Sequence, residues 1–462
     1  MLNKRKNKPL LTVYITNYNY AKFIKQSIDS VLRQTFKDFE LIIIDDGSTD
    51  NSRDIILEYE NEKNVYTVFQ KNQGLNKTNN NALKIANGKY IVRLDADDFL
   101  APQALELMVN ELERNPEFVM IFPDYYLVDE NGTVLDQVRR HDFKRDVTLM
   151  DLPAHGACTV IRTDVLKKIG GYDESFKCQD GYDIWLKIIS KYNVNNISLP
   201  LFYYRQHGAS LTKNEKTILK TRAQIKEKHI KKKNNSSPNV LVIIPVRGAS
   251  THPKSISLEK LHKKPLIDWT IDSALESKTV SDILISTPDN AIIEHVKHKY
   301  EDNVIVMDRQ KELARINTPL EPTVSEAIKY YSHIKTKPDL VVLLFIESPF
   351  RSAFYIDKAV HTQQIFDTDV VDGIREEDDI FYYHNGDGLR PWNINSGLRL
   401  ERDNLFRRSG GIHLIQREFF ERERNILSGK IGHITLDQRS AFTIRTEMDW
   451  KIAQYLALEE QK

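Results

Sequence analysis

The feature that most restricts the fold is a strand–helix–strand pattern near the start of the sequence. The apolar, β-rich runs 11–15 and 41–44 each predict a strand. Between them, apolar residues recur on one helical face at Phe23, Ile24, Ile28, Val31 and Leu32. Strand, helix and strand with short connections form a parallel pair, so we predict the α/β class.

The same pattern begins again after residue 239. Residues 240–244, 283–286 and 341–346 predict strands, and 266–275 predict a helix. A chain of 462 residues is too long for one ordinary core. Residues 226–239 are polar, charged and turn-prone, and their lysines lack the interleaved aromatics of a nucleic-acid patch, so we interpret them as a solvated linker. We therefore predict two successive Rossmann-like α/β nucleotide-binding domains, 1–225 and 240–462, joined by the polar linker 226–239.

Charge and cysteine content narrow the class of protein. Sixty-six basic residues against 65 acidic ones leave a formal charge of +1, which gives no argument for nucleic acid or an anionic membrane as partner. No apolar run approaches the roughly 20 residues that a spanning helix needs, and the basic N-terminus is not followed by a signal-peptide core. Only Cys158 and Cys178 are present, which favours a reducing compartment. We expect a cytoplasmic protein without a membrane span, and leave open peripheral association with the inner face of the membrane.

Three carboxylates follow a predicted strand directly. Residues 90–94 are apolar apart from Arg93, and Asp95, Asp97 and Asp98 come next. Open parallel sheets bind ligands at the carboxyl ends of their strands. Crowded carboxylates repel one another unless a cation offsets their charge, and a hard divalent ion that holds a diphosphate is the simplest such cation. The alternative is a solvated acidic turn without a ligand.

Four motifs in order resemble those of family 2 glycosyltransferases with the GT-A fold. They are Ile15-Thr16-Asn17-Tyr18-Asn19, Ile44-Asp45-Asp46-Gly47-Ser48-Thr49-Asp50, Asn72-Gln73-Gly74-Leu75 and Leu94-Asp95-Ala96-Asp97-Asp98. The resemblance covers residues 9–215 and implies that a nucleotide-sugar donor binds at these loops. The nucleotide-binding residues that it implies are Thr16, Tyr18, Asn19, Asp46 for the nucleobase, Gly74, Lys77 and Asp95.

The resemblance also implies a divalent metal, Mg²⁺ or Mn²⁺. Asp95 and Asp97 match the family's DxD pair, with Asp97 the better candidate for direct contact. Residues 203–207 resemble the family's closing segment, whose Arg and His approach the diphosphate or metal, so His207 is a further candidate ligand; its alternative is a structural role. Asn79-Asn80 stands where relatives often have Arg-Asn, so the cation that pairs with the diphosphate is absent or comes from elsewhere, for instance from Lys77.

The acceptor hydroxyl needs a general base. Gln179-Asp180-Gly181-Tyr182-Asp183-Ile184-Trp185 resembles the segment in which the family places its catalytic carboxylate, although a Gly is inserted and the usual Glu is Gln. Asp180 is the first candidate and Asp183 the second. The alternative for Asp183 is the N-cap of the helix that follows.

The second half resembles the cytidylyltransferases that make CMP-sialic acid and related CMP-nonulosonates. The matching residues, within 239–460, are Val242-Ile243-Ile244-Pro245-Val246-Arg247-Gly248-Ala249-Ser250, Lys264-Pro265-Leu266-Ile267, Ile285-Ser286-Thr287, Glu347-Ser348-Pro349-Phe350-Arg351 and Ser409-Gly410-Gly411-Ile412. The resemblance implies a second nucleotide-binding fold. Its implied anion contacts are Arg247, Lys254, Arg351 and Arg407.

Groups that CTP chemistry needs are replaced in this half. Thr251 and Ile256 stand where lysines should hold the triphosphate, and Lys254 compensates only if the loop is shortened. Thr443 and Arg445 stand where two metal-binding aspartates are expected, and an arginine repels the ion. We therefore interpret the half as a degenerate module for binding or for homo-oligomerisation.

These patterns predict a metal-dependent, inverting glycosyltransferase of the hexosyltransferase type. It would transfer a sugar from a nucleotide-diphosphate donor, first of all a UDP-sugar, to a hydroxyl of a glycan or lipid-linked acceptor in surface polysaccharide or glycoconjugate synthesis. Two alternatives remain: a bifunctional enzyme that also makes a CMP-nonulosonate from CTP, and a non-catalytic scaffold or binding protein.

Overall fold

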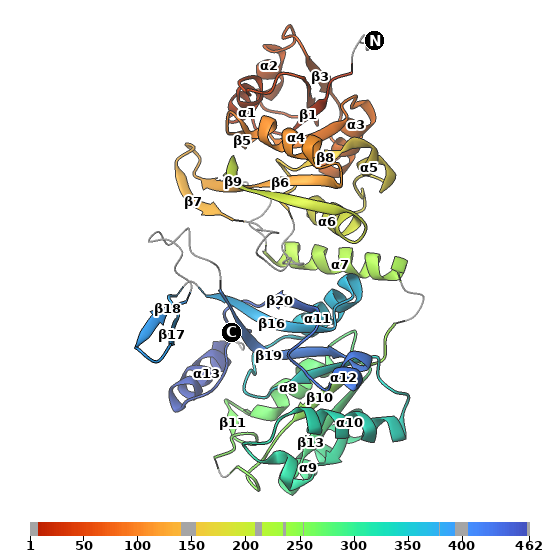
Figure 1. The fold of residues 1–462 in the computed structure, drawn as a ribbon, viewed down its shortest axis with the longest axis vertical. Helices are drawn as coiled ribbons and strands as arrows, with labels where there is room; N and C mark the ends of the chain where they lie inside the picture. The colour runs from red at the N-terminus through yellow and green to blue at the C-terminus, as the bar shows by residue number, and fades with distance from the viewer. Residues whose placement is uncertain are drawn as a thin grey trace. The chain divides into compact units, whose positions relative to one another are not determined.

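The computed structural model describes residues 8–139, 154–207, 215–233, 237–252, 254–377, 379–392 and 405–459. The chain divides into two compact units, Met1–His229 and Ile230–Lys462 (Figure 1). The division lies inside the segment 226–239. Within the described ranges, no helix is both long enough and apolar enough to cross a bilayer.

A mixed sheet of nine strands forms the centre of the first unit. Its order is β3-β2-β1-β4-β8-β6-β9-β5, with β7 paired to β6. Strands β1 to β4 are parallel, whereas β8 runs antiparallel to both β4 and β6. The strands are β1 (Leu11–Asn17), β2 (Phe39–Asp45), β3 (Val65–Phe69), β4 (Tyr90–Asp95), β5 (Phe99–Leu100), β6 (Phe118–Val128), β7 (Val134–Val138), β8 (Val160–Arg162) and β9 (Asn193–Arg205).

Side chains along β1 point alternately to the two faces of this sheet. Leu11, Val13 and Ile15 point to one face, where they join apolar residues of α1 and α4 in one core. Tyr14 points to the other face, where its hydroxyl meets that of Tyr172 at 3.0 Å. The helices of the unit are α1 (Ile24–Leu32), α2 (Ser52–Leu57), α3 (Leu75–Ile85), α4 (Ala104–Arg114), α5 (Thr163–Lys168), α6 (Asp180–Ile189) and α7 (Glu215–Lys233).

The first part of the expected linker is helical. Residues 226–233 continue helix α7, and Lys226 is only 2% exposed, so the expectation that the lysines are solvated is wrong for this residue. Its ammonium lies 5.9 Å from the centre of the Tyr182 ring. Tertiary contacts with the first unit therefore override the composition of this segment.

The second unit is built on a seven-stranded sheet. Its order is β14-β13-β10-β15-β19-β16-β20, and β17-β18 and β11-β12 are separate two-stranded pairs. The strands are β10 (Val240–Pro245), β11 (Lys260–Leu261), β12 (Lys264–Pro265), β13 (Asp282–Thr287), β14 (Ile305–Asp308), β15 (Leu340–Leu344), β16 (Val370–Glu377), β17 (Tyr382–His384), β18 (Leu389–Pro391), β19 (Leu405–Gln416) and β20 (Ile431–Thr435). The helices are α8 (Leu266–Leu275), α9 (Asn290–Tyr300), α10 (Glu321–Ile334), α11 (Ala353–Phe366), α12 (Arg417–Glu423) and α13 (Glu447–Glu459).

Strands β14, β13, β10 and β15 of this sheet are parallel, as the strand–helix–strand pattern predicts. Antiparallel β19 then joins β15 to β16. Each unit thus has an open α/β sheet, and the predicted fold class is confirmed. In such sheets ligands bind at the carboxyl ends of the parallel strands.

Candidate active site

The carboxyl ends of β1, β2 and β4 bring the predicted nucleotide and metal residues to one edge of the first sheet. Thr16 pairs with Asp95 of β4 on one side and with Ile44 of β2 on the other. Asn17 pairs with Asp45, and Asp46 follows directly. Because the three strands are adjacent and parallel, residues about 80 positions apart in the sequence meet here.

Side chains cross-link the loops that follow β1 and β2. Asn17 Nδ2 donates to Asp45 Oδ1 at 2.8 Å, and the Asn19 amide donates to Ser48 Oγ at 2.9 Å. Asn19, whose φ is 61°, also accepts from the Thr49 amide at 2.7 Å. Tyr18 stays 46% exposed between these anchored residues. The loops hold a fixed shape that leaves an aromatic ring accessible to a ligand.

Asp46 organises the third loop. Its carboxylate accepts from Gln70 Nε2 at 2.7 Å and from the Gln73 and Gly74 amides at 2.9 Å each. Gly74, with φ of 86°, then begins helix α3, and Lys77 is exposed in the first turn. Asp46 therefore shapes the loop, and its contact with a nucleobase stays a prediction.

Arg93 joins the acidic loop to the candidate base. Its guanidinium is 4% exposed, with Nε 2.9 Å from Asp95 Oδ1 and Nη1 donating to Asp180 Oδ2. Burial would lower the pKa of Arg93, but the charges of Asp180 and Asp95 outweigh burial and raise it. Burial raises the pKa of Asp95 to about 6, and the charges of Asp97 and Asp180 act in the same direction against Arg93.

Asp97 and His207 contact each other, and their role as metal ligands stays a prediction. His207 Nε2 lies 2.8 Å from Asp97 Oδ2, and both residues are buried. Tyr20 and Phe23 pack against the imidazole with ring centres 5.6 and 5.1 Å away. Burial raises the pKa of the Tyr20 hydroxyl, and the charge of Asp97 adds to this. The imidazole is thus fixed by aromatic packing beside the acidic loop.

Arg205 has a different place from the one that the resemblance implies. Its Nε donates to the Asp97 carbonyl at 2.8 Å, and its Nη1 to the Glu130 carbonyl at 2.6 Å. Its amide donates to Asp98 Oδ1 at 2.9 Å, and the residue is 1% exposed. The expected approach of its guanidinium to a diphosphate is therefore wrong for this structure, because the group is already used to brace the acidic loop.

The two candidate bases have different partners. Asp180, the first residue of α6, faces Arg93, whereas Asp183 is bound by Lys187 at 2.6 Å and His229 at 2.9 Å. Burial would raise the pKa of Asp183, but the hydrogen bond from His229 and the charge of Lys187 outweigh burial and lower it. The structure thus ties Asp183 to Lys187 of its own helix α6 and to His229 of α7, and of the two carboxylates it brings only Asp180 to the acidic loop. The expected N-cap role is also wrong, because α6 already begins at Asp180, after Gln179.

Gly156 covers the Arg93–Asp180 ion pair. A Cβ at this position would lie 2.7 Å from Arg93 Nη2 and 3.3 Å from Asp180 Oδ2. A Cβ on Gly181 would lie 2.9 Å from the Gly156 Cα. Close backbone approach at the ion pair therefore requires glycine at both positions.

Among the described residues, no group of three or more His, Cys, Asp and Glu side chains is arranged to hold a metal ion. Oδ2 of Asp98 is buried and accepts no hydrogen bond from those residues, whereas Oδ1 of Asp95 lies 2.9 Å from Arg93 Nε and Asp97 holds an imidazole. Burial raises the pKa of Asp98 well above its usual range, and the charges of Asp97 and Asp95 add to this. Carboxylate oxygens with one imidazole suit Mg²⁺ or Mn²⁺, which would offset this repulsion.

Comparison with known proteins identifies the first unit. Residues 12–170 match the model described as glycosyl transferase family 2. An uncharacterised glycosyltransferase of Methanocaldococcus jannaschii is 34% identical over 209 residues, which are 43% of this chain and 71% of that protein. The chain belongs to glycosyltransferase family 2. A chondroitin synthase of Escherichia coli is 31% identical over 234 residues, 50% of this chain but only 33% of that protein.

Two solved structures are also similar to about half of the chain. TarS 1-349 of S. aureus in complex with UDP-GlcNAc has a TM-score of 0.42 and 21% sequence identity. The matched region is 48% of this chain and 66% of the TarS chain. A mannosyltransferase of Pyrobaculum calidifontis in complex with GDP-Man and Mn²⁺ has a TM-score of 0.40 and 18% sequence identity. The matched region is 50% of this chain and 67% of the mannosyltransferase chain.

The second unit of this family 2 glycosyltransferase holds a cytidylyltransferase domain, since residues 241–367 match the model of that description. Two of its expected anion contacts have protein partners. Arg351 is 2% exposed and donates to the Gly410 carbonyl at 2.8 Å, and burial lowers its pKa to about 9. Arg407 pairs with Glu377 at 2.9 Å. Arg351 is thus buried against strand β19, which contains Gly410, and its contact with an anion stays a prediction.

Arg247 and exposed Lys254 lie on the loop after β10. Close by, a cavity of about 560 Å³ is lined by residues from the ends of β10, β13 and β14, among them Ser250, Asp289 and Arg309. Burial lowers the pKa of Arg309 to about 10, and the charge of Arg247 contributes. Asp289 and Asp308 also line the cavity, and Arg309 is 4% exposed and donates to the Val246 carbonyl at 2.9 Å, so the cavity by itself does not identify an anion site.

Arg93 links both halves of the candidate site but is not among the predicted site residues. Its position carried a signal, because a charged residue inside an otherwise apolar strand is buried only when it is paired. Asn76, Asn80 and Arg222 are not among the predicted site residues either. Their roles depend on contacts with residues 43 to 100 positions away, for which the local sequence carries no signal.

Proposed function

We propose that this family 2 enzyme is a metal-dependent, inverting glycosyltransferase of the hexosyltransferase type. It would transfer a sugar from a nucleotide-diphosphate donor, first of all a UDP-sugar, to a hydroxyl of a glycan or lipid-linked acceptor in surface polysaccharide or glycoconjugate synthesis. The observation that carries the proposal is the convergence of Asp95 and Asp180 on Arg93, beside the Asp97–His207 pair.

In this mechanism Asp180 accepts the proton of the acceptor hydroxyl. The freed oxygen forms a bond to the anomeric carbon as the bond from that carbon to the diphosphate breaks, and attack from the opposite face inverts the configuration. Asp97, Asp95 and His207 would hold the Mg²⁺ or Mn²⁺, which neutralises the charge on the leaving diphosphate when bound. Thr16, Tyr18, Asn19, Asp46, Gly74 and Lys77 would hold the nucleotide.

A thermal-shift screen of nucleotide sugars tests the proposal. Binding at 100 times the dissociation constant stabilises a protein by about 2.7 kcal/mol. For a unit of this size we expect a rise in Tm of roughly 5–10 °C with one nucleotide sugar in the presence of Mn²⁺ or Mg²⁺. The same ligand with EDTA is the control. A set of UDP-, GDP- and other nucleotide sugars that gives no metal-dependent rise would contradict the proposal.

For the second unit we propose binding or homo-oligomerisation rather than CTP chemistry. Homo-oligomerisation is supported by the β17–β18 hairpin, where Leu389 is 68% and Trp392 71% exposed. We expect the protein to sediment as an oligomer, and Leu389→Ser/Trp392→Ser to sediment as a monomer with an unchanged Tm. Ile316→Ser, which changes another exposed apolar residue, should leave the mass unchanged. A monomeric wild-type protein would refute this part.

Two alternative functions, a bifunctional enzyme and a non-catalytic scaffold, can be distinguished by experiment. The cavity beside Arg309 is the candidate nucleotide site, and CTP-dependent release of pyrophosphate with a nonulosonic acid would establish the bifunctional enzyme. A scaffold without catalysis would bind no nucleotide sugar in a metal-dependent manner. The cytoplasmic location, with or without peripheral membrane association, remains part of this proposal and is tested by fractionation of cells.

A further inference from the structure

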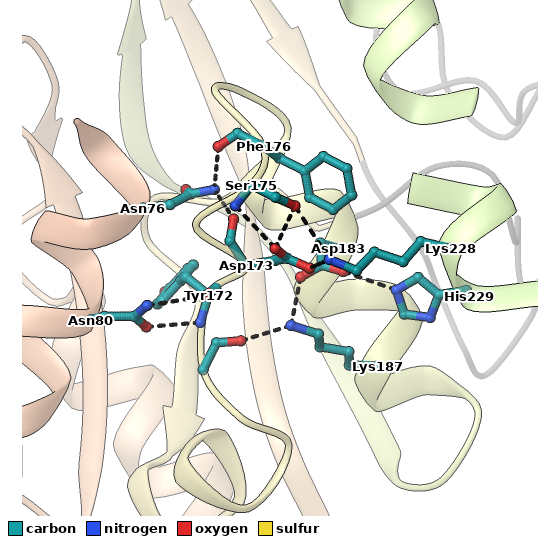
Figure 2. Close-up of polar contacts among 11 residues, drawn as sticks. Asn76, Asn80, Tyr172, Asp173, Ser175, Phe176, Asp183, Lys187, Lys228 and His229 are labelled. Carbon is teal, nitrogen blue, oxygen red and sulfur yellow. Dashed lines mark hydrogen bonds and ion pairs between the residues drawn. The ribbon is translucent and has the colours of Figure 1, made fainter. Parts of the chain in front are cut away.

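The loop that precedes Asp180 is held from two sides. Residues 171–179 connect α5 to α6, and Figure 2 shows side chains from α3 on one side of this loop and from α7 on the other. None of these side chains belongs to the nucleotide or metal residues described above. They all contact the backbone or the polar side chains of the segment around Asp180, the candidate base.

Two asparagines of α3 bind the loop backbone. Asn80 Nδ2 donates to the Tyr172 carbonyl, and Asn80 Oδ1 accepts from the Tyr172 amide, both at 2.9 Å. Asn76 Nδ2 donates to the carbonyls of Asp173 and Phe176 at 2.8 Å each. Because α3 begins at the loop that Asp46 organises, one helix contacts both the nucleotide side of the site and the loop that leads to Asp180.

Helix α7 binds the same loop through charged groups. Lys228 Nζ pairs with Asp173 Oδ2 and lies 3.2 Å from Ser175 Oγ. His229 Nε2 lies 2.9 Å from Asp183 Oδ1 (Figure 2). Burial would raise the pKa of Asp173, but the hydrogen bonds from Lys228 and Ser175 outweigh burial and lower it. Charged partners at both ends of the loop therefore fix its path.

Arg222 of α7 reaches the residue directly before Asp180. Its Nε donates to Gln179 Oε1 at 2.7 Å, and its guanidinium lies 5.0 Å from the centre of the Tyr182 ring. Gln179 has φ of 62° and ψ of 31°, a left-handed conformation that side-chain-bearing residues rarely adopt. The Gln179 carbonyl accepts from the amides of Tyr182 and Asp183, so this conformation sets the first turn of α6.

We propose that α7 is part of the transferase site, with Arg222 as a positioning residue. By holding Gln179 in its left-handed conformation, Arg222 directs Asp180 toward Arg93. A helix that begins inside the predicted first domain and continues into the predicted linker thereby determines where the general base stands. The inference rests on the proposed role of Asp180, but its structural part, the conformation of residue 179, is testable without it.

The first test is Arg222→Ala in the full-length protein. Displacement of a catalytic group by about 1 Å can cost about 100-fold in rate, so we expect kcat for sugar transfer to fall about 10- to 100-fold. The KM for the nucleotide sugar should not change, because the contacts of Arg222 lie on the Asp180 side of the site. Arg222→Gln, which keeps a hydrogen-bond donor, should restore part of kcat. Lys220→Ala removes an exposed cation of the same helix and is the matched control.

A double-mutant cycle with Gln179→Gly tests whether Arg222 acts through the conformation of residue 179. Glycine adopts the left-handed conformation without the steric cost of a Cβ, so the loop should no longer need Arg222. We expect Arg222→Ala to lower kcat by less than about threefold in the Gln179→Gly background, against 10- to 100-fold in the wild-type background. An equal loss in both backgrounds would overturn the proposal, because it would show that Arg222 acts by another route.

Hydrogen exchange separates this inference from the assignment of Asp180. Arg222→Ala should increase amide exchange at Tyr182 and Asp183, whose amides bond to the Gln179 carbonyl, and the added substitution Gln179→Gly should reverse the increase. If exchange responds in this way while Asp180→Asn keeps full activity, the positioning role stands and the base assignment fails. Unchanged exchange at these amides in Arg222→Ala would overturn the proposal, whatever the activity of Asp180 variants.

Discussion

Replacement of Asp180 by Asn is expected to lower kcat for sugar transfer by about 10²- to 10⁴-fold, the range that a positioned general base contributes. Asn keeps the shape of the side chain but cannot accept the proton. The dissociation constant for the nucleotide sugar should change little, because Asp180 meets the nucleotide side only through Arg93. Steady-state kinetics and calorimetric titration with the sugar donor measure the two quantities separately.

Asp183→Asn provides the comparison that decides between the two carboxylates. It removes a group bound to Lys187 and His229, so we expect a lower Tm and a fall in kcat of less than about tenfold. Asp164→Asn, an exposed residue at the start of α5, controls for the chemical change itself. If Asp183→Asn removed transfer while Asp180→Asn kept it, the roles assigned here would be reversed.

The parallel half of each sheet was predictable because its signals are local. Apolar runs and a helical repeat specify β1, α1 and β2, and the parallel direction follows from their order. The other half of the first sheet carries no such signal: β8 is antiparallel to β4 and β6, whereas β6 and β9 are parallel to each other. Strand β9 pairs with β6 through several register shifts, and its sequence contains polar residues and a proline. The partner strand and the register there depend on packing that only the folded chain defines.

For the candidate site, the residues at the strand ends were predictable. Carboxylates placed after strands had to meet at the carboxyl edge, and Asp46, Asp95 and Asp97 do. What could not be predicted is how the loops are held. The composition of residues 226–239 indicates a linker, but residues 226–233 are helical, and Lys228 and His229 among them pair with Asp173 and Asp183. A charged segment has a defined structure when its partners are distant in sequence.

Asp97→Ala is expected to remove activity without a loss of stability. A metal that neutralises the leaving diphosphate contributes several kcal/mol, so loss of its principal ligand should lower kcat by at least about 10³-fold. Burial is the main cause of the raised pKa values of Asp95 and Asp98, and the negative charge of Asp97 adds to both, so this carboxylate repels them in the absence of a cation. Its removal should therefore leave the Tm of the ligand-free protein unchanged or higher.

The metal concentration dependence distinguishes a ligand from a residue that only shapes the loop. Asp97→Asn keeps one carboxamide oxygen, so part of the activity should return at high Mn²⁺, with a half-saturating concentration well above that of the wild-type protein. His207→Asn should shift the same curve less, because one ligand of several is weakened. Asp136→Ala, an exposed carboxylate on β7, should leave the curve unchanged. Loss of activity in Asp97→Asn with an unchanged Mn²⁺ dependence would exclude Asp97 as a ligand and leave the acidic loop with a purely structural role.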